Sequence, residues 1–237
     1  MKKTFVVAID GHAGCGKSSI CSETSKQNSW VYISTGALYR GLAYLARTRN
    51  IKLENHEALE ELLSDFCENS SWNEKSQSLF YKKENIGPHL MSEEIGKMAS
   101  IFAKETRVRE KLLPLQRQMI NSFPQKIVLV EGRDITTVVC QDAPLKIFMT
   151  ASIEERASRR LKQLQENKQD KQISLEDLKK EIAERDHNDS SRELAPLVKA
   201  QDALLFDTTG LSFADCILKL SKSIEAAYAR SLHSQGE

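Results

Sequence analysis

The chain has 237 residues, of which 40% are hydrophobic and 28% charged, and its formal net charge is +1. This length and composition suit one large globular domain with a substantial core. The near-neutral charge argues against a broad electrostatic surface for nucleic acid or for membranes. Five cysteines occur at scattered spacings without a C-x-x-C pair, so they indicate neither a zinc site nor a disulfide framework. We therefore expect reduced thiols in a cytoplasmic protein.

The N-terminus superficially resembles an export signal, because two lysines precede an apolar run. That run, residues 5–9, is shorter than the ~7 apolar residues that an export signal needs, and Asp10 ends it. No stretch of the sequence approaches the ~18 apolar residues of a membrane-spanning helix. We therefore expect neither export nor a membrane partner.

The first predicted element is a buried strand over residues 5–9, since this run is apolar, rich in β-branched residues and followed by a turn. Residues 11–18 then read GHAGCGKS and fit the pattern G-x-x-x-x-G-K-[ST], and helical character follows to about residue 26. In this pattern the glycines let main-chain amides turn inward around an anion, and the helix N-terminus adds its positive dipole end. The sequence therefore predicts binding of a nucleoside triphosphate.

Two side chains of this loop have expected roles of their own. Lys17 reaches the outer phosphates as a positive charge, and the Ser18 hydroxyl is the expected Mg²⁺ ligand. The predicted ATP-binding residues are Gly11, His12, Ala13, Gly14, Cys15, Gly16, Lys17, Ser18 and Ser19.

The rest of the chain alternates short apolar strands with helices, which predicts a parallel sheet covered by helices on both faces. Residues 69–89 differ, because short strand-like segments joined by polar turns indicate a small inserted sheet. The expected strands cover residues 31–33, 71–73, 79–82, 85–86, 126–130, 145–150 and 203–206. After the strand at 31–33, one helix is expected to end at about residue 47, and a second covers 55–66 with Asn55 as its N-cap. A long helical tract covers 92–122, with a break near Thr106 and with Pro114 near a second start. Three more helices begin at capping boxes at Ser152, Ser174 and Ser212, and the last of them runs to about residue 230.

A GTP-dependent switch is the rival class for a nucleotide-binding loop. Residues 167–170 fit the N-K-x-D pattern of guanine recognition, and residues 207–210 fit the D-x-x-G pattern that senses the γ-phosphate. The first pattern follows a polar helical segment rather than a buried strand, and the two occur in the reverse of the order found in switch proteins. The sequence therefore favours an enzyme over a switch.

Phosphoryl transfer requires several positive groups around the transferring phosphate. Arg133 directly follows a predicted strand, at the sheet edge where open α/β sheets bind ligands. Arg156 and Arg160 are four residues apart on one predicted helix and therefore share a face, and residues 185–192 form a charged helix end and loop that suits a mobile cover. The candidate arginines are Arg40, Arg107, Arg109, Arg133, Arg156, Arg159, Arg160, Arg185 and Arg192.

Over nearly its whole length the chain resembles the bacterial cytidylate kinases, which are nucleoside monophosphate kinases. The resemblance is carried by IDGHAGCGKSS near the start, STGALYR at 34–40, EGRDITTVV at 131–139, DAPLKIFMTASIEERASRR at 142–160, EIAERDHNDSSRELAPL at 181–197 and DTTGLS at 207–212. It implies one P-loop kinase domain over 1–237 with a five-stranded parallel core, an acceptor-binding insert with a small sheet at 34–103 and a lid at 159–192. It also implies transfer of the γ-phosphoryl of ATP to CMP or dCMP with Mg²⁺, within pyrimidine metabolism.

The same resemblance assigns roles to individual residues. Arg40 and Arg133 would hold the phosphate of the acceptor, with Thr35 near that nucleotide, and Ser100, Arg109 and Asp134 would recognise cytosine. Arg160, Arg185 and Arg192 would gather the transferring phosphates together with Lys17, and Asp189 with Arg185 would meet the ribose.

The assignment of Asp134 has a physical basis. Cytosine presents an amine donor at N4, which a carboxylate accepts, whereas uracil presents an acceptor there. The mismatch is worth roughly 1–3 kcal/mol, so we expect CMP to be preferred over UMP. The other interpretation is that Asp134 pairs with Arg133 or supports Mg²⁺ from a distance.

Several positions depart from the usual pattern of the family, namely Ser34, Met91, Thr136, Cys140, Gln141, Asn188 and Ser190. They bear on acceptor affinity and lid closure rather than on the class of reaction. A kinase for UMP, shikimate or another small acceptor is the alternative within the same class. We expect a monomer, because the sequence shows no exposed apolar stripe.

Overall fold

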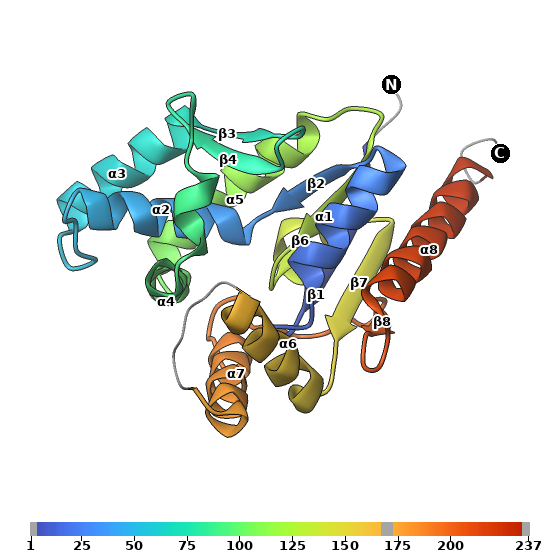
Figure 1. The fold of residues 1–237 in the computed structure, drawn as a ribbon. Helices are drawn as coiled ribbons and strands as arrows, with labels where there is room; N and C mark the ends of the chain where they lie inside the picture. The colour runs from blue at the N-terminus through green and yellow to red at the C-terminus, as the bar shows by residue number, and fades with distance from the viewer. Residues whose placement is uncertain (1–3, 167–172, 234–237) are drawn as a thin grey trace. The chain divides into compact units, whose positions relative to one another are not determined.

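The computed structural model describes residues 4–166 and 173–233. Its main element is a parallel sheet of five strands in the order β2-β6-β1-β7-β8, which confirms the predicted α/β fold (Figure 1). The strands form where the sequence has short apolar runs, and most of their residues are buried, as in a sheet covered on both faces. They are β1 (Phe5–Gly11), β2 (Val31–Ser34), β6 (Ile127–Glu131), β7 (Leu145–Thr150) and β8 (Leu204–Asp207).

The chain forms two compact units. We call Phe5–Trp30 with Glu131–Glu237 the loop unit, because it contains the glycine-rich loop, and Met1–Thr4 with Val31–Val130 the insert unit. By their residue numbers, the proposed insert at 34–103 belongs to the insert unit, and the proposed lid at 159–192 belongs to the loop unit.

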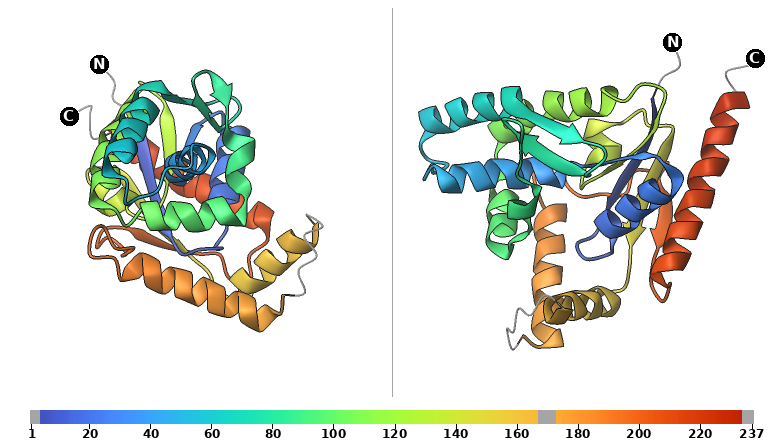
Figure 2. Two further views of the ribbon diagram at one scale, coloured as in Figure 1. Left: turned by 90° about the vertical axis from the view of Figure 1, so that its left-hand side faces the viewer. Right: turned by 45° about the horizontal axis from the view of Figure 1, so that its top comes forward.

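In the loop unit, β7 pairs in parallel with both β1 and β8, so that Ile147 lies opposite Ile9 on one side and Leu204 on the other. Helix α1 (Lys17–Asn28) packs beside α8 (Phe213–His233) (Figure 1). Helices α6 (Ile153–Glu166) and α7 (Leu175–Ser190) form a second packed pair, which Figure 2 shows from two further directions. This pair has a small apolar core of its own, made by Ala157, Leu164, Leu178 and Ile182.

In the insert unit, four helices surround an apolar core that includes the fully buried Phe66 and Leu42. They are α2 (Gly36–Thr48), α3 (His56–Asn69), α4 (Glu93–Phe102) and α5 (Thr106–Asn121). An antiparallel sheet of β3 (Ser70–Asn73), β4 (Ser78–Tyr81) and β5 (Glu84–Asn85) confirms the predicted inserted sheet. A short 3₁₀ turn, η1 (Gly87–Met91), follows it.

The predicted helix starts are confirmed by their capping hydrogen bonds. The Asn55 side chain accepts from the Ala58 amide at the start of α3. The hydroxyls of Ser152, Ser174 and Ser212 accept from amides three residues later, at 3.2, 3.1 and 3.1 Å. These bonds satisfy amides that have no partner within the helix itself.

Besides small shifts at the ends of elements, the structure differs from the sequence prediction at several places. The tract over 92–122 does break, but Pro114 lies inside α5 rather than near its start, where the ring removes one helical hydrogen bond. Residues Ile135–Val139 form a π-helical turn, η2, that was not predicted. Helix α8 continues to His233 rather than ending near residue 230. The N-K-x-D pattern at 167–170 lies outside the described residues.

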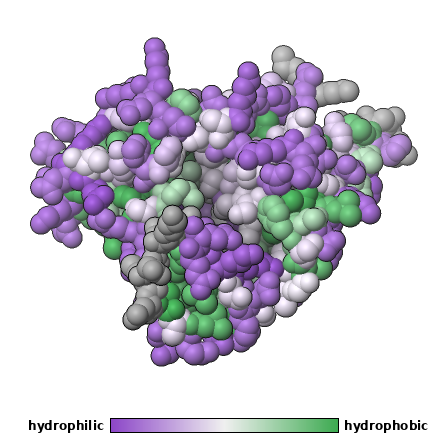
Figure 3. Space-filling model, in the orientation of Figure 1, coloured by the Kyte–Doolittle hydropathy of each residue, from purple (hydrophilic) through white to green (hydrophobic). Residues whose placement is uncertain are grey.

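No helix within residues 4–166 and 173–233 is long and apolar enough to cross a membrane. Exposed apolar side chains occur on β8 and along the first part of α8, where Figure 3 shows hydrophobic surface. They are Leu204, Leu205, Phe213 and Leu218, each more than half exposed. Among the described residues, β8 is the edge strand of the sheet and pairs with β7 alone, so less of the protein covers its side chains.

One polar cluster joins three elements of the insert unit. The Asp65 carboxylate of α3 accepts from Arg49, at the end of α2, at 2.8 Å and from Lys82, after β4, at 3.1 Å. It also accepts from the hydroxyl of Tyr81. Burial by itself would raise the pKa of Asp65, but the hydrogen bonds from Tyr81, Arg49 and Lys82 outweigh it and lower that pKa to about 2.

This cluster predicts a particular pH dependence of stability. The pKa of Asp65 is about 2 in the folded protein, which is lower than its ordinary value of 3.8. The ionised carboxylate therefore stabilises the fold fully above pH 3.8, and this stabilisation is lost as the pH falls towards about 2. We expect Asp65→Asn to lower the free energy of unfolding at pH 6, and the deficit to shrink between about pH 4 and pH 2. Urea unfolding at each pH measures this, with Glu61→Gln, an exposed residue of the same helix, as control. A deficit independent of pH contradicts the role given to the ionised carboxylate.

Candidate active site

The glycine-rich loop connects β1 to α1, and glycine is required at its bends. Gly14 and Gly16 have φ values of 74° and 90°, in the left-handed region that other residues rarely adopt. At Gly11 a side chain is also excluded by space, because a Cβ would lie 1.9 Å from the carbonyl oxygen of Met149. Where the loop begins, the backbone therefore lies too close to β7 for any side chain to fit.

Two loop side chains are held by neighbouring groups. The Lys17 ammonium donates to the carbonyls of Gly11 at 2.7 Å and His12 at 2.9 Å, and burial, followed by the positive charge of Arg133, lowers the pKa of Lys17. His12 Nδ1 lies 3.0 Å from the Thr150 hydroxyl, and its pKa is lowered mainly by burial. The lysine thus lies against the loop, where an incoming phosphate can replace the carbonyl oxygens as its partner.

A carboxylate that the sequence analysis did not single out lies beside Ser18. The Ser18 hydroxyl donates to Glu131 Oε1 at 3.0 Å, and Glu131 is buried at the end of β6. A hydroxyl and a carboxylate are the oxygen ligands that Mg²⁺ takes from proteins when substrate phosphates and water complete its shell. Within residues 4–166 and 173–233 there is no cluster of three or more His, Cys, Asp or Glu that could hold a metal ion. Glu131 is the last residue of β6, and its partner Ser18 is 113 residues away in the chain, so no local pattern in the sequence indicated this contact.

The Asp10 carboxylate anchors the turn that follows Arg133 and Asp134. It accepts from the amides of Ile135 and Thr136, both at 2.8 Å, and from the Thr136 hydroxyl at 2.6 Å. Burial raises the pKa of Asp10, and these hydrogen bonds oppose the rise. Thr136, a departure from the family pattern, therefore has a structural partner.

Asp189 of α7 joins two of the predicted phosphate-binding arginines. Its carboxylate accepts from Arg133 Nε at 2.8 Å and from the Arg192 guanidinium. Burial alone would raise the pKa of Asp189, but the charges of Arg133, Arg192 and Arg185 lower it. Arg192 is 8% exposed, and its buried Nε has no hydrogen-bond partner among the described residues. Arg192 is therefore held in place through Asp189, while its Nε hydrogen is left without a hydrogen bond among the described residues.

The arginines of α6 do not act alike. Arg156 donates to the carbonyl of Ala151 at 3.0 Å and to that of Ala13 at 3.1 Å. Arg159 donates to the carbonyl of Thr208 at 2.8 Å, whereas Arg160 donates to the side chain of Gln163 at 2.8 Å. Arg156 and Arg160, which the helical spacing placed on one face, thus have different kinds of partner. Arg159 also donates to the carbonyl of Cys15 in the glycine-rich loop at 3.4 Å, a contact that the sequence did not indicate.

The predicted acceptor residues of the insert unit lie on its helices. Arg40 of α2 donates to the Leu90 carbonyl at 2.7 Å, and its guanidinium would be 3.2 Å from a Cβ added at Gly96. Ser100 of α4 donates to the Gly96 carbonyl of the same helix at 3.1 Å, so the side chains of Arg40 and Ser100 both lie near Gly96.

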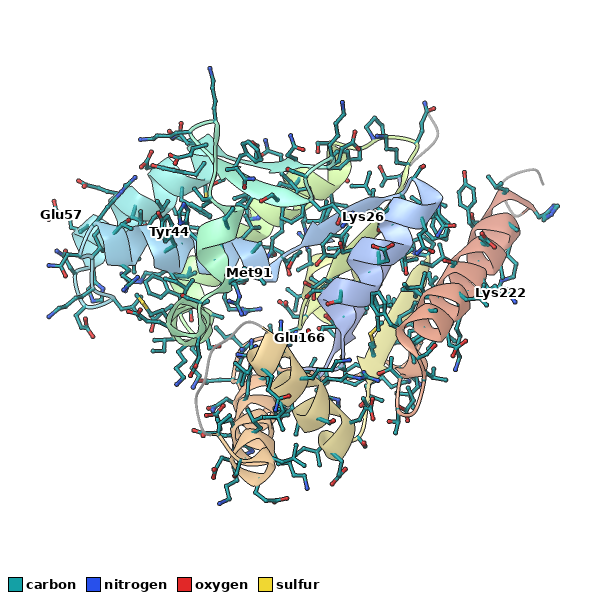
Figure 4. All side chains as sticks on the ribbon, viewed as in Figure 1. Lys26, Tyr44, Glu57, Met91, Glu166 and Lys222 are labelled. Atoms are coloured by element: carbon teal, nitrogen blue, oxygen red, sulfur yellow. The ribbon has the colours of Figure 1, made fainter. Side chains whose placement is uncertain are left out.

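The other predicted acceptor residues, and one position that departs from the family pattern, are buried or exposed to very different degrees. Arg109 donates to the Ala103 carbonyl at 3.1 Å with its guanidinium over the Tyr39 ring, and Thr35 is buried before α2. Met91, which replaces a usual basic residue, is 77% exposed and lies in η1 (Figure 4). In the loop unit, Asp134 is buried directly after Arg133.

A parallel sheet whose first strand leads into a glycine-rich anion-binding loop, a lysine and a helix N-terminus defines a P-loop nucleotide-binding protein. A sequence model of the family described as "Cytidylate kinase" matches residues 7–226. The cytidylate kinase of Bacillus cereus (strain ATCC 10987 / NRS 248) is 38% identical over 97% of this chain and 100% of its own length. That of Bacillus cytotoxicus is 40% identical over 96% and 99%. The chain belongs to the cytidylate kinase family and is a nucleoside monophosphate kinase.

Similarity to solved structures is confined to the fold. The crystal structure of an uncharacterized protein from Eubacterium ventriosum has a TM-score of 0.53 at 11% sequence identity. The match covers 94% of this chain and 99% of that one.

The Asp10 anchor predicts opposite outcomes for two adjacent threonines. Thr136→Val removes the hydroxyl that donates to the buried Asp10 carboxylate, so we expect the free energy of unfolding to fall by about 1–3 kcal/mol. The Thr137 hydroxyl is buried and has no hydrogen-bond partner among the described residues, so Thr137→Val should be neutral or slightly stabilising. Urea unfolding of both variants measures the difference, and equal losses contradict the anchor.

Proposed function

We propose that this protein transfers the γ-phosphoryl group of ATP to CMP or dCMP, which yields ADP with CDP or dCDP in pyrimidine nucleotide metabolism. The observation that carries this proposal is the family match over residues 7–226, which includes both the phosphate loop and the arginine-bearing segments. The loop geometry and its buried lysine support ATP as the donor.

The residues beside the loop suit Mg²⁺. Ser18 and Glu131 would hold the ion, directly or through water, and the ion would neutralise charge on the phosphates when bound. Independently of the ion, the loop amides and Lys17 bind and orient the triphosphate, and the buried position of Lys17 keeps water away from its charge.

We assign the transferring phosphates to Lys17, Arg133, Arg160, Arg185 and Arg192. The contacts of Asp189 support this for Arg133 and Arg192, because one carboxylate holds both guanidiniums ready before a phosphate binds. For Arg160 and Arg185 the support is the family resemblance of the segments that carry them.

For the acceptor we propose that Arg40 and Arg133 hold its phosphate, and that Ser100, Arg109 and Asp134 recognise cytosine. A buried carboxylate at Asp134 accepts from the cytosine amine and disfavours the acceptor oxygen of uracil. Thr35 would lie near the nucleotide, and Asp189 with Arg185 would meet its ribose. We also propose an acceptor insert at 34–103, a lid at 159–192, and a cytoplasmic monomer that acts on small molecules without a nucleic-acid or membrane partner.

The role assigned to Lys17 predicts that its removal lowers turnover but leaves the stability of the folded protein unchanged. Lys17→Ala should lower kcat by about 100-fold or more, because the charge acts on the transferring phosphates. The folded state should keep its stability, since a buried ammonium whose pKa burial lowers is costly to accommodate. Coupled ADP release and thermal unfolding measure the two effects, with Lys26→Ala as control from the exposed end of the same helix (Figure 4). Near-normal turnover of Lys17→Ala contradicts the assignment.

An acceptor screen tests the substrate. With ATP and Mg²⁺, kcat/KM for CMP should exceed that for UMP by more than about tenfold, and Asp134→Asn should reduce this preference. Acceptor-dependent ADP release in a panel of CMP, dCMP, UMP and shikimate measures it. Equal efficiency with CMP and UMP contradicts the role of Asp134, and transfer to UMP or shikimate alone supports the alternative kinase.

A further inference from the structure

The phosphate loop is held from outside by a pair of charged residues that the proposed function does not use. We propose that Asp186 and Arg156 together clamp the Ala13 peptide of the loop, and that Asp186 is a positioning residue for ATP binding. This inference rests on the proposed function, because it concerns how the same loop is shaped for the triphosphate.

Both polar groups of Ala13 have a partner in this pair. The Ala13 amide donates to Asp186 Oδ1 at 3.0 Å, and Arg156 Nη1 donates to the Ala13 carbonyl at 3.1 Å. The Arg156 guanidinium also donates to the second oxygen of Asp186, and its Nε donates to the Ala151 carbonyl at 3.0 Å. The side chains therefore fix the amide and the carbonyl of one residue at once.

The pair is largely enclosed, so its charges and hydrogen bonds are weakened little by solvent. The side chains of Arg156 and Asp186 are 8% and 16% exposed. A Cβ added at Gly14 would lie 3.5 Å from Arg156 Cβ and 3.9 Å from Ile182 Cδ1, so α6 and α7 pack directly on the loop. A charged pair with this little solvent around it is screened weakly.

Charge balance explains why the loop tolerates a carboxylate. An unpaired carboxylate at an amide of an anion-binding loop would repel a triphosphate, and Arg156 offsets that charge. Because the Ala13 amide is already engaged by Asp186, the triphosphate is left to the amides that follow it in the loop. Ala13, which the sequence assigned to ATP binding, then shapes the loop rather than donating to the triphosphate.

Helix α7 also connects the clamp to the arginines. Asp186 and Asp189 are three residues apart, so they are neighbours on the helix surface. Asp186 holds the loop, while Asp189 holds Arg133 and Arg192. The orientation of one helix therefore sets the loop and two phosphate-binding arginines together.

The experiment is ATP binding to the full-length protein by calorimetry, together with separate KM values for ATP and CMP. Asp186→Ala should weaken ATP binding and raise the KM for ATP by about tenfold, and leave the KM for CMP within about twofold. Asp186→Asn keeps an acceptor for the Ala13 amide, so its loss of ATP affinity should be smaller than that of Asp186→Ala.

Two controls separate positioning from stability. Glu184→Ala changes an exposed residue of the same helix and should leave both binding and thermal stability unchanged. Leu178→Ala opens the buried core between α6 and α7 and should lower the melting temperature without weakening ATP binding.

The possible results are distinguishable. If Asp186→Ala lowers the melting temperature as Leu178→Ala does but binds ATP within about twofold of the original protein, the inference is overturned. An equal rise in the KM for both substrates overturns it as well. If Asp186→Ala does not fold, Asp186→Asn decides by the same criteria. If the unsubstituted protein neither binds ATP nor phosphorylates CMP, the proposed function itself is refuted.

Discussion

The buried carboxylate of Asp10 is the contact on which the geometry of the phosphate site depends. Asp10 is the residue before Gly11, and it holds the amides of Ile135 and Thr136, which directly follow Arg133 and Asp134. One side chain therefore relates the start of the loop to the segment that supplies an arginine and a carboxylate. A buried carboxylate without partners would be strongly unfavourable, so its donors are what allow it to remain inside the fold.

Around the loop, the charged groups are paired before any nucleotide arrives. Asp189 holds Arg133 and Arg192, and Asp186 holds Arg156. Positive groups that are already oriented need little rearrangement when charge develops on a transferring phosphate, which is the main source of electrostatic catalysis in such sites. Lys17 is the donor that a phosphate can engage most directly, because the partners of its ammonium, the carbonyls of Gly11 and His12 and the Cys15 sulfur, all belong to the loop itself.

Two departures from the usual family pattern have a structural explanation. The Thr136 hydroxyl supplements the backbone donors of Asp10. The Ser190 hydroxyl donates to the Asp186 carbonyl at 2.8 Å, which satisfies a carbonyl in the last turn of α7. Thr136 and Ser190 therefore stabilise the turn and the helix that carry site residues, and their contacts in the structure are with the protein itself.

The sequence by itself determined the α/β class, the order of strands and helices, the helix caps and the phosphate loop. These features depend on hydrophobic periodicity and on hydrogen bonds between residues three or four positions apart, which are visible in a short window. The roles of Glu131, Asp10, Arg156 and Asp186 were not visible there. Their partners are 113, 125, 143 and 173 residues away in the chain, at Ser18, Ile135, Ala13 and Ala13. Only the packing of the sheet and of α6 and α7 brings such residues within hydrogen-bond distance, because no local rule decides which distant side chain will face a given strand end or loop.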